Sequence, residues 1–126
     1  MIIELAFQCM AQNIYFEARG ESTRGQYAVA HVTYNRANYD LGKVCGIVHA
    51  KSQFSWTLQK DKLRITDKVA WEKAMFIAED AYYQPDFTNR SVFYHANYMT
   101  PDWDFSKLVK TMTIGGHTFY RRKGKQ

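Results

Sequence analysis

The chain has 126 residues, of which 46% are hydrophobic and 16% aromatic. This length predicts a single domain over residues 1–126 with one sizeable core. Only two prolines and seven glycines occur, which excludes a disordered or fibrous chain. The formal net charge of +5 favours an anionic partner such as nucleic acid, an acidic glycan or a bacterial wall. Part of this charge lies in the basic C-terminal tail, at Arg121, Arg122, Lys123 and Lys125.

The two cysteines, Cys9 and Cys45, do not have the spacing of a metal site. We expect two buried thiols, which suits a reducing compartment, although the sequence leaves their pairing open. The N-terminus has no basic segment and Glu4 interrupts its apolar run, so no signal peptide is predicted. No apolar stretch is long enough for a membrane span, so we expect no stable membrane insertion.

The first segment, residues 2–17, predicts a helix. Glu4, Gln8 and Gln12 recur every four residues and form a narrow polar stripe, and the rest of the segment is largely apolar. We therefore expect this helix to be buried on most sides. At 100° per residue, Glu17 falls opposite the polar stripe, which predicts that its carboxyl group points inward.

Further helices are predicted in the middle of the chain. A second helix should cover residues 24–37, capped by Ser22 or Thr23 after a break at Gly20. A short helix is expected at 43–50 and a loop or short strands at 51–65. Asp67 can cap a long helix that ends near Tyr83.

The last third of the chain predicts strands. Residues 91–95 are typical of a short strand, and two further strands at 108–114 and 117–121 flank Gly115-Gly116, a strong hairpin signal. This turn pairs Thr113 with Thr118 and Met112 with Phe119. The predicted fold class is α+β, mostly helical with a small antiparallel sheet that includes a C-terminal hairpin.

Glu17 is the first candidate for chemistry. Burial disfavours the ionised form of a carboxyl group and raises its pKa, and a glycosidase needs such an acid to protonate its leaving group near neutral pH. Periodicity alone leaves open that Glu17 simply pairs with Arg19 or Arg36. Glu21 is interpreted as mainly structural, holding Arg19 or Arg36 in an ion pair ahead of the second helix.

Other kinds of site find little support in the sequence. The four histidines show no close metal-ligand spacing, so no metal site is predicted. Phosphate-binding, dinucleotide-binding and serine-nucleophile motifs do not occur, so no cofactor is predicted. Two aromatic clusters, Phe54-Ser55-Trp56 and Pro101-Asp102-Trp103, combine rings with polar side chains, a composition that suits sugars as well as ordinary packing.

An ordered series of short motifs extends along nearly the whole chain. The motifs run over about residues 9–121 and read, in order, Asn13-Ile14-Tyr15-Phe16-Glu17-Ala18-Arg19-Gly20-Glu21, Gly25-Gln26-Tyr27-Ala28-Val29-Ala30, Asn35-Arg36, Cys45-Gly46-Ile47-Val48, Gln53-Phe54-Ser55-Trp56, Phe93-Tyr94-His95-Ala96, Pro101-Asp102-Trp103 and Ile114-Gly115-Gly116-His117-Thr118-Phe119-Tyr120. This ordered set of motifs resembles the catalytic domain of the SleB/CwlJ family of cell-wall hydrolases. The resemblance implies a lysozyme-like or lytic-transglycosylase-like fold that cleaves the MurNAc–GlcNAc bond of peptidoglycan, with Glu17 as general acid.

This resemblance leads to a set of expected sugar contacts. The expected polar contacts are Asn35, Ser55, His95, Thr113 and His117. The expected sugar-facing rings are Phe54, Trp56, Tyr94 and Trp103. No second carboxylate stands in a comparable motif, with Asp102 and Asp104 as weak candidates, so the sequence favours a lytic transglycosylase over a muramidase that hydrolyses the bond.

The expected biological setting follows from the same resemblance. Without a leader the chain resembles a phage endolysin, a monomer made in the bacterial cytoplasm that acts on peptidoglycan glycan strands after release. The rival from another class is a basic module that binds nucleic acid through its tail and hairpin. The aromatic residues fall largely on apolar stripes rather than beside the positive charges, which argues against the rival.

Overall fold

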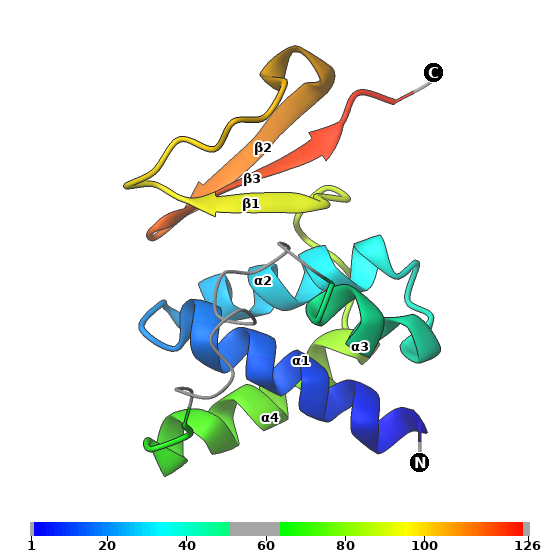
Figure 1. The fold of residues 1–126 in the computed structure, drawn as a ribbon, viewed down its shortest axis with the longest axis vertical. Helices are drawn as coiled ribbons and strands as arrows, with labels where there is room; N and C mark the ends of the chain where they lie inside the picture. Colours follow the sequence, from blue (N-terminus) through cyan, green and yellow to red (C-terminus); the bar gives the residue numbers. More distant parts are fainter. Residues whose placement is uncertain (1, 51–63, 125–126) are drawn as a thin grey trace.

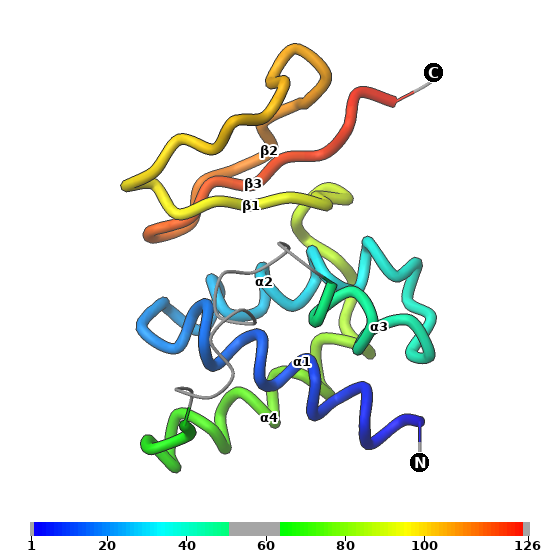
Figure 2. Tube along the Cα trace, in the orientation of Figure 1, coloured from blue at the N-terminus to red at the C-terminus, as the bar shows by residue number. Residues whose placement is uncertain are grey.

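The computed structural model describes residues 2–50 and 64–124 and has a helical layer beneath a three-stranded sheet (Figure 1). In the described residues, helices come first along the chain and strands follow. The elements are α1 (Ile2–Ala18), α2 (Thr23–Arg36), α3 (Leu41–Val48), α4 (Lys68–Tyr83), β1 (Phe93–Ala96), a 3₁₀ helix (Phe105–Lys107), β2 (Leu108–Ile114) and β3 (His117–Arg122). The trace in Figure 2 enters the sheet only after all four helices are complete. This arrangement confirms the predicted mostly helical α+β class.

Three helices begin at a residue whose side chain satisfies their free N–H groups. Ser22 caps α2 by accepting a hydrogen bond from the Gly25 amide, Asp40 caps α3, and Asp67 caps α4. The predicted caps at Ser22 and Asp67 are therefore confirmed, and the helix boundaries fall within one or two residues of those predicted. Part of the loop predicted at 51–65 lies outside the described residues.

Helix α1 packs against α2, α3 and α4 and is the centre of the helical layer. Its buried side chains, including Met10, Ile14 and Tyr15, form the main core with Tyr34 of α2 and Ile77 of α4. The expectation that α1 is buried on most sides is wrong at its start. There the apolar side chains are half or more exposed because the neighbouring helices cover only the later turns: Ile2 is 67% exposed, Ile3 50% and Leu5 56%.

A second core lies between α2 and the sheet. Val29 and Val32 of α2 meet Phe119 of the central strand β3, with Tyr94 and Met112 from the flanking strands. The strand order is β1-β3-β2 and both pairings are antiparallel. Because side chains alternate along a strand, this contact fixes which residues face the helices.

The hairpin of β2 and β3 has the predicted register. Thr113 lies opposite Thr118, and Met112 lies opposite Phe119. A bulge that the sequence did not predict falls at Thr111. The Thr111 hydroxyl donates a hydrogen bond of 3.1 Å to the Phe119 carbonyl oxygen, which holds the extra residue in place.

The cysteines correct a further expectation. Cys9 of α1 and Cys45 of α3 are joined by a disulfide bond rather than present as two thiols. The two helices pack side by side and bring the Cα atoms of these residues within 5.3 Å, a normal separation for a bridge. The bond ties the catalytic-candidate helix α1 to the short helix α3.

Candidate active site

Glu17 lies in the last turn of α1, on the same side of the helix as the fully buried Met10 and Asn13. The inward direction predicted from periodicity is therefore confirmed. Burial raises the pKa of Glu17 from 4.5 to about 7. Glu17 can thus hold a proton at neutral pH.

Tyr94 of β1 interacts electrostatically with Glu17. Burial is the main cause that raises its pKa well above the usual value, and the charge of Glu17 raises it further. Asn13 and Arg36 act in the opposite direction on the same hydroxyl group. These four side chains, from α1, α2 and β1, therefore form one electrostatic cluster in which the phenol remains protonated.

Asn13 is a member of this cluster that the list of expected site residues did not include. It lies one helical turn before Glu17 and is fully buried. Its side-chain nitrogen donates a hydrogen bond of 3.2 Å to the hydroxyl oxygen of Thr33 on α2. The signal that could have identified it was a polar residue on an otherwise apolar stripe, because a buried amide requires partners.

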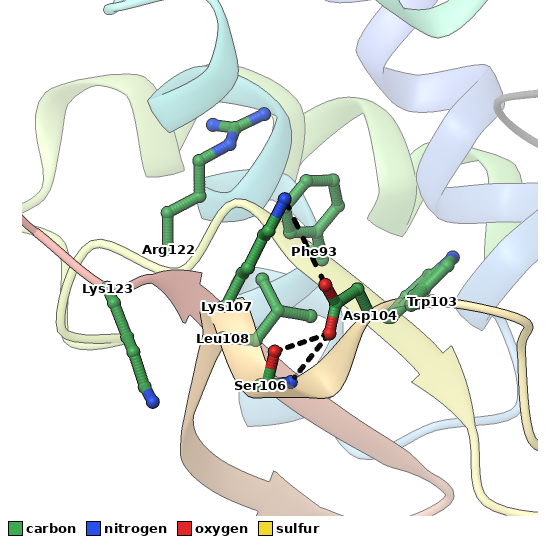
Figure 3. Close-up of a pocket in the computed structure, with 8 residues that line it drawn as sticks. All are labelled: Phe93, Trp103, Asp104, Ser106, Lys107, Leu108, Arg122 and Lys123. Atoms are coloured by element: carbon green, nitrogen blue, oxygen red, sulfur yellow. Dashed lines mark hydrogen bonds and ion pairs between the residues drawn. The ribbon is translucent and has the colours of Figure 1, made fainter.

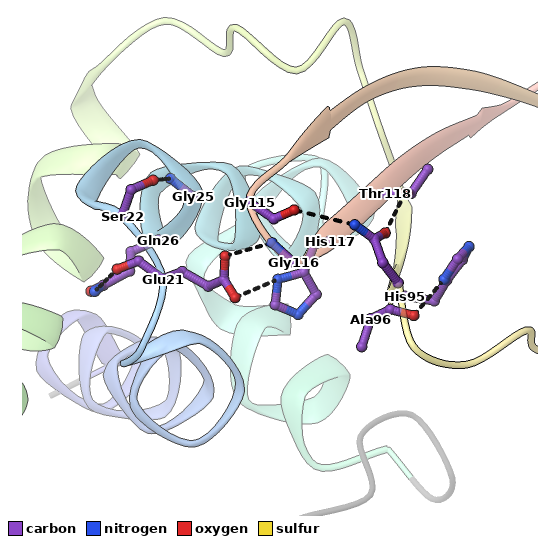
Figure 4. Close-up of polar contacts among 11 residues, drawn as sticks. Glu21, Ser22, Gly25, Gln26, His95, Ala96, Gly115, Gly116, His117 and Thr118 are labelled. Carbon is purple, nitrogen blue, oxygen red and sulfur yellow. Dashed lines mark hydrogen bonds and ion pairs between the residues drawn. The ribbon is translucent and has the colours of Figure 1, made fainter.

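Glu21 has different partners from those predicted. Its carboxylate accepts a hydrogen bond of 2.9 Å from the Gly116 amide and lies 3.8 Å from the His117 ring nitrogen, as Figure 4 shows. These contacts differ from the ion pair with Arg19 or Arg36 that the sequence suggested. Glu21 instead joins the start of α2 to the turn between β2 and β3.

The two arginines that were expected to pair with Glu21 have their own contacts. Arg19 donates to the Tyr15 carbonyl oxygen at 3.3 Å, and its guanidinium lies 4.4 Å from the centre of the Tyr15 ring. Arg36 donates to the Val92 carbonyl oxygen at 3.2 Å and lies over the Phe93 ring. Both side chains reach back to the framework, and Arg36 also reaches the Glu17 cluster through Tyr94.

Asn35 was predicted to contact sugar, and the structure gives it a framework role. Its side-chain nitrogen donates to the Asp86 carboxylate at 3.1 Å and to the Ser91 carbonyl oxygen at 2.9 Å. These bonds fix the segment between α4 and β1 onto α2. Asn35 thereby positions β1 and, with it, Tyr94.

The remaining predicted contacts are divided between the two faces of the sheet. Tyr94 and His117 face the helices, where burial lowers the pKa of His117 and Glu21 opposes that shift. His95 and Thr113 both lie beside Thr118, on the opposite face, and Trp103 packs against His95. The sheet therefore separates the predicted contacts into two groups. Phe54, Ser55 and Trp56 lie outside the described residues.

Comparison with known proteins shows which family the chain belongs to. Residues 20–120 match the family described as Cell Wall Hydrolase. The match covers most of the chain, and the protein belongs to this cell wall hydrolase family. It is an enzyme family whose substrate is the cell wall, and the match begins three residues after Glu17.

Two solved structures share the fold over 92% of this chain, each with a TM-score of 0.72. One is the catalytic domain of the SleB protein of Bacillus cereus, which is 25% identical and covered over 89% of its length. The other is the catalytic domain of the germination-specific lytic transglycosylase SleB of Bacillus anthracis, which is 28% identical and covered over 93%. No curated protein matches the chain.

None of the helices within residues 2–50 and 64–124 has both the length and the apolar character needed to cross a membrane. Over the same ranges, His, Cys, Asp and Glu side chains do not gather in a group of three that could hold a metal ion.

Proposed function

We propose that this protein cleaves the MurNAc–GlcNAc bond of peptidoglycan as a lytic transglycosylase, with Glu17 as acid and then base. The observation that supports this most directly is the state of Glu17. Among the described residues it is the carboxyl group whose pKa is raised, to about 7, so it is divided between its acid and base forms at neutral pH. One group with this pKa can serve both steps.

The proposed reaction uses only the substrate and Glu17. The protonated carboxyl donates its proton to the glycosidic oxygen as the bond to C1 breaks and positive charge develops on the sugar ring. The carboxylate that results takes the proton from the MurNAc 6-hydroxyl while the oxygen of that hydroxyl bonds to C1. The products are a free 4-hydroxyl on GlcNAc and a 1,6-anhydro ring on MurNAc, and no water is consumed.

The surroundings of Glu17 favour this route over hydrolysis. Hydrolysis needs a second carboxylate that activates water or attacks C1. Glu21 is engaged by Gly116 and His117, and Asp104 caps the 3₁₀ helix through Ser106. Both carboxylates are therefore committed to the framework. The relative from Bacillus anthracis is itself named a lytic transglycosylase, which supports the same choice.

The test is a Glu17→Gln variant assayed on purified cell walls, with mass spectrometry of the fragments released by the wild type. We expect the variant to lose wall cleavage by at least a hundredfold because a general acid contributes about 10²–10⁴ in rate. The matched control is Glu72→Gln, the same chemical change on the exposed surface of α4, which should cleave normally. Cleavage by purified Glu17→Gln would contradict the assignment.

The fragments distinguish the two mechanisms. A transglycosylase releases anhydro ends, which are lighter by one water than the reducing ends that a muramidase releases. Reducing ends alone would replace the transglycosylase proposal with the muramidase alternative. Family membership favours either enzyme over a nucleic-acid-binding module.

A narrower form of the proposal is bacteriolytic action as an endolysin. The net charge of +5 supports it, because a basic protein accumulates at anionic walls. In that setting the polypeptide is made in the host cytoplasm and acts on the wall after release.

A further inference from the structure

The outer side of the sheet has a cavity of about 570 Å³ that the proposed reaction does not use. Its walls come from β1, the connection to β2, the 3₁₀ helix and the paired ends of β2 and β3 (Figure 3). The lining residues are Phe93, Trp103, Asp104, Ser106, Lys107, Leu108, Arg122 and Lys123. The volume is within the range of about 300–1,000 Å³ that is typical of ligand sites.

The cavity concentrates positive charge. Lys107, Arg122 and Lys123 line it together with one carboxylate, Asp104. One Asp104 oxygen lies 3.9 Å from the Lys107 ammonium, and the other accepts hydrogen bonds from the amide and hydroxyl of Ser106. Asp104 is therefore used to shape the 3₁₀ helix, and the lining retains an excess of cations.

The strand pairing fixes the positions of these cations. The Lys123 amide donates to the Lys107 carbonyl oxygen at 2.9 Å, and Leu108 lies opposite Arg122 in the β2–β3 ladder. Three basic residues are thus held side by side by main-chain bonds. A cluster of basic residues favours an anion, because like charges near one another repel.

The repulsion is most evident at Phe93. The guanidinium groups of Arg122 and Arg36 lie 4.8 Å and 5.1 Å from the centre of its ring. Burial lowers the pKa of Arg36, and the charge of Arg122 lowers it further. An anion bound in the cavity would relieve this repulsion, so the charge arrangement favours an anionic ligand.

The floor of the cavity is aromatic. Phe93 and Trp103 contact each other with ring centres 5.5 Å apart, and such rings stack on the apolar faces of sugars and peptides. A ligand that uses both the rings and the cations has an apolar surface as well as a negative group. This combination favours an acidic part of a larger wall polymer over a free inorganic ion.

The cavity and Glu17 lie on opposite faces of β1. Tyr94, which interacts with Glu17, faces the helices, and its neighbour Phe93 points to the other face. β1 is an edge strand of the sheet. A polymer bound at Glu17 can therefore extend around this edge toward the cavity.

We propose that the cavity between the β1–β2 connection and the ends of β2 and β3 binds an anionic group carried by the cell-wall polymer. This group is either a carboxylate of a peptide stem or a phosphate of an attached wall polymer. The choice of ligand rests on the proposed function, and the cavity itself does not take part in bond cleavage.

The test is binding to insoluble walls, measured in a Glu17→Gln background so that cleavage does not consume the ligand. Replacement of Lys107, Arg122 and Lys123 by Gln should weaken binding about tenfold, because each of the three partly exposed charge contacts contributes a modest amount. The control replaces Lys68 and Lys73 of α4 by Gln. Equal affinity of the two variants would overturn the proposal.

Two wall preparations distinguish the sources of the negative group. Walls stripped of phosphate polymers retain stem carboxylates, and walls with amidated stems retain phosphates. If binding is lost only on walls stripped of phosphate polymers, the ligand is the phosphate. If it is lost only on walls with amidated stems, the ligand is the stem carboxylate. Either result supports the site.

A single charge reversal, Lys107→Glu, guards against misfolding of the triple variant. The Lys107 side chain is 81% exposed, so its replacement leaves the packing intact. It should also weaken wall binding, and unchanged binding by this folded variant would count against the site. Cleavage retained in the Glu17→Gln background would contradict the proposed function and leave this comparison of variants valid.

Discussion

The raised pKa of Glu17 suits the proposed chemistry, but it lowers the stability of the folded protein at alkaline pH. A carboxyl group whose pKa rises on folding binds its proton more tightly in the folded state than in the unfolded chain. Its contribution to stability is complete below the unfolded pKa of 4.5 and is lost as the pH rises through about 7. At alkaline pH the folded protein must hold a poorly solvated charge.

The Glu17→Gln variant should therefore gain stability relative to the wild type as the pH rises. A shift of the pKa from 4.5 to about 7 corresponds to roughly 3 kcal/mol at full ionisation. We expect the difference in the free energy of unfolding to change by about this amount between pH 4 and pH 8, in favour of the variant. Urea denaturation at several pH values measures it.

The control for this measurement is again Glu72→Gln, whose side chain is exposed on α4. It should follow the wild type at every pH. A Glu17→Gln curve parallel to that of the wild type would show that Glu17 titrates in the folded protein as it does in the unfolded chain.

For individual residues, the sequence predicted the direction of a side chain better than it predicted the residues that the side chain contacts. The helical period placed Glu17 on the inward side of α1, and its burial agrees with that. The contact between Glu21 and Gly116 joins residues 95 positions apart. No local pattern contains such a contact, so the sequence suggested the nearby arginines instead.

The β2–β3 hairpin depends on the absence of side chains in its turn. A Cβ atom at Gly116 would lie 2.8 Å from one oxygen of the Glu21 carboxylate, and one at Gly115 would lie 2.3 Å from the other. Gly115 also has a φ of +52°, a conformation that other residues adopt at a cost. The turn is therefore built around the carboxylate.

A double-mutant cycle should reveal this dependence. Gly116→Ala displaces the carboxylate and breaks its hydrogen bond to residue 116, which should cost about 1–2 kcal/mol. In a Glu21→Ala background the same change should cost little, because the bond is already lost. Thermal or urea unfolding of the four proteins gives the coupling free energy.

Gly115→Ala is the comparison for this cycle. Its backbone strain persists without the carboxylate, so it should remain destabilising in both backgrounds. Additive costs for Gly116→Ala and Glu21→Ala would mean that the carboxylate does not hold the turn.

The elements themselves were largely predictable. Helix caps at Ser22 and Asp67 and the hairpin turn at Gly115-Gly116 are local signals with a clear physical basis. The bulge at Thr111 could not be predicted, because it depends on how β2 fits against both β3 and Ser91. The Ser91 hydroxyl lies 2.5 Å from the Thr111 hydroxyl. Its cause is tertiary rather than local.

At the scale of the whole molecule, the disulfide bond joins the two sides of the main core. Cys9 and Cys45 are 36 residues apart, and their pairing depends on the packing of α1 against α3. The sequence could not reveal that packing. Two cysteines without a further pattern are compatible with a disulfide bond or with two free thiols.

Replacement of both cysteines by serine should lower the free energy of unfolding by about 2–4 kcal/mol, because the bond restricts the unfolded chain. Wall cleavage at moderate temperature should be retained, since Glu17 lies about 12 Å farther along α1 at 1.5 Å per residue. Urea denaturation with and without a reducing agent measures the effect.

Reduced wild type should resemble the double serine variant, and the variant should not respond to the reducing agent. Identical stability of the oxidised wild type and the variant would show that the bond does not stabilise the fold.

The contact between Glu21 and the glycine turn also limits how this domain can be recombined. A chimera that combines this hairpin with a domain that has a different residue at position 21 would separate the turn from the carboxylate around which it is built. Crossovers placed anywhere between residues 21 and 115 split this unit. Domain shuffling should succeed more often when the residue at position 21 travels with the hairpin.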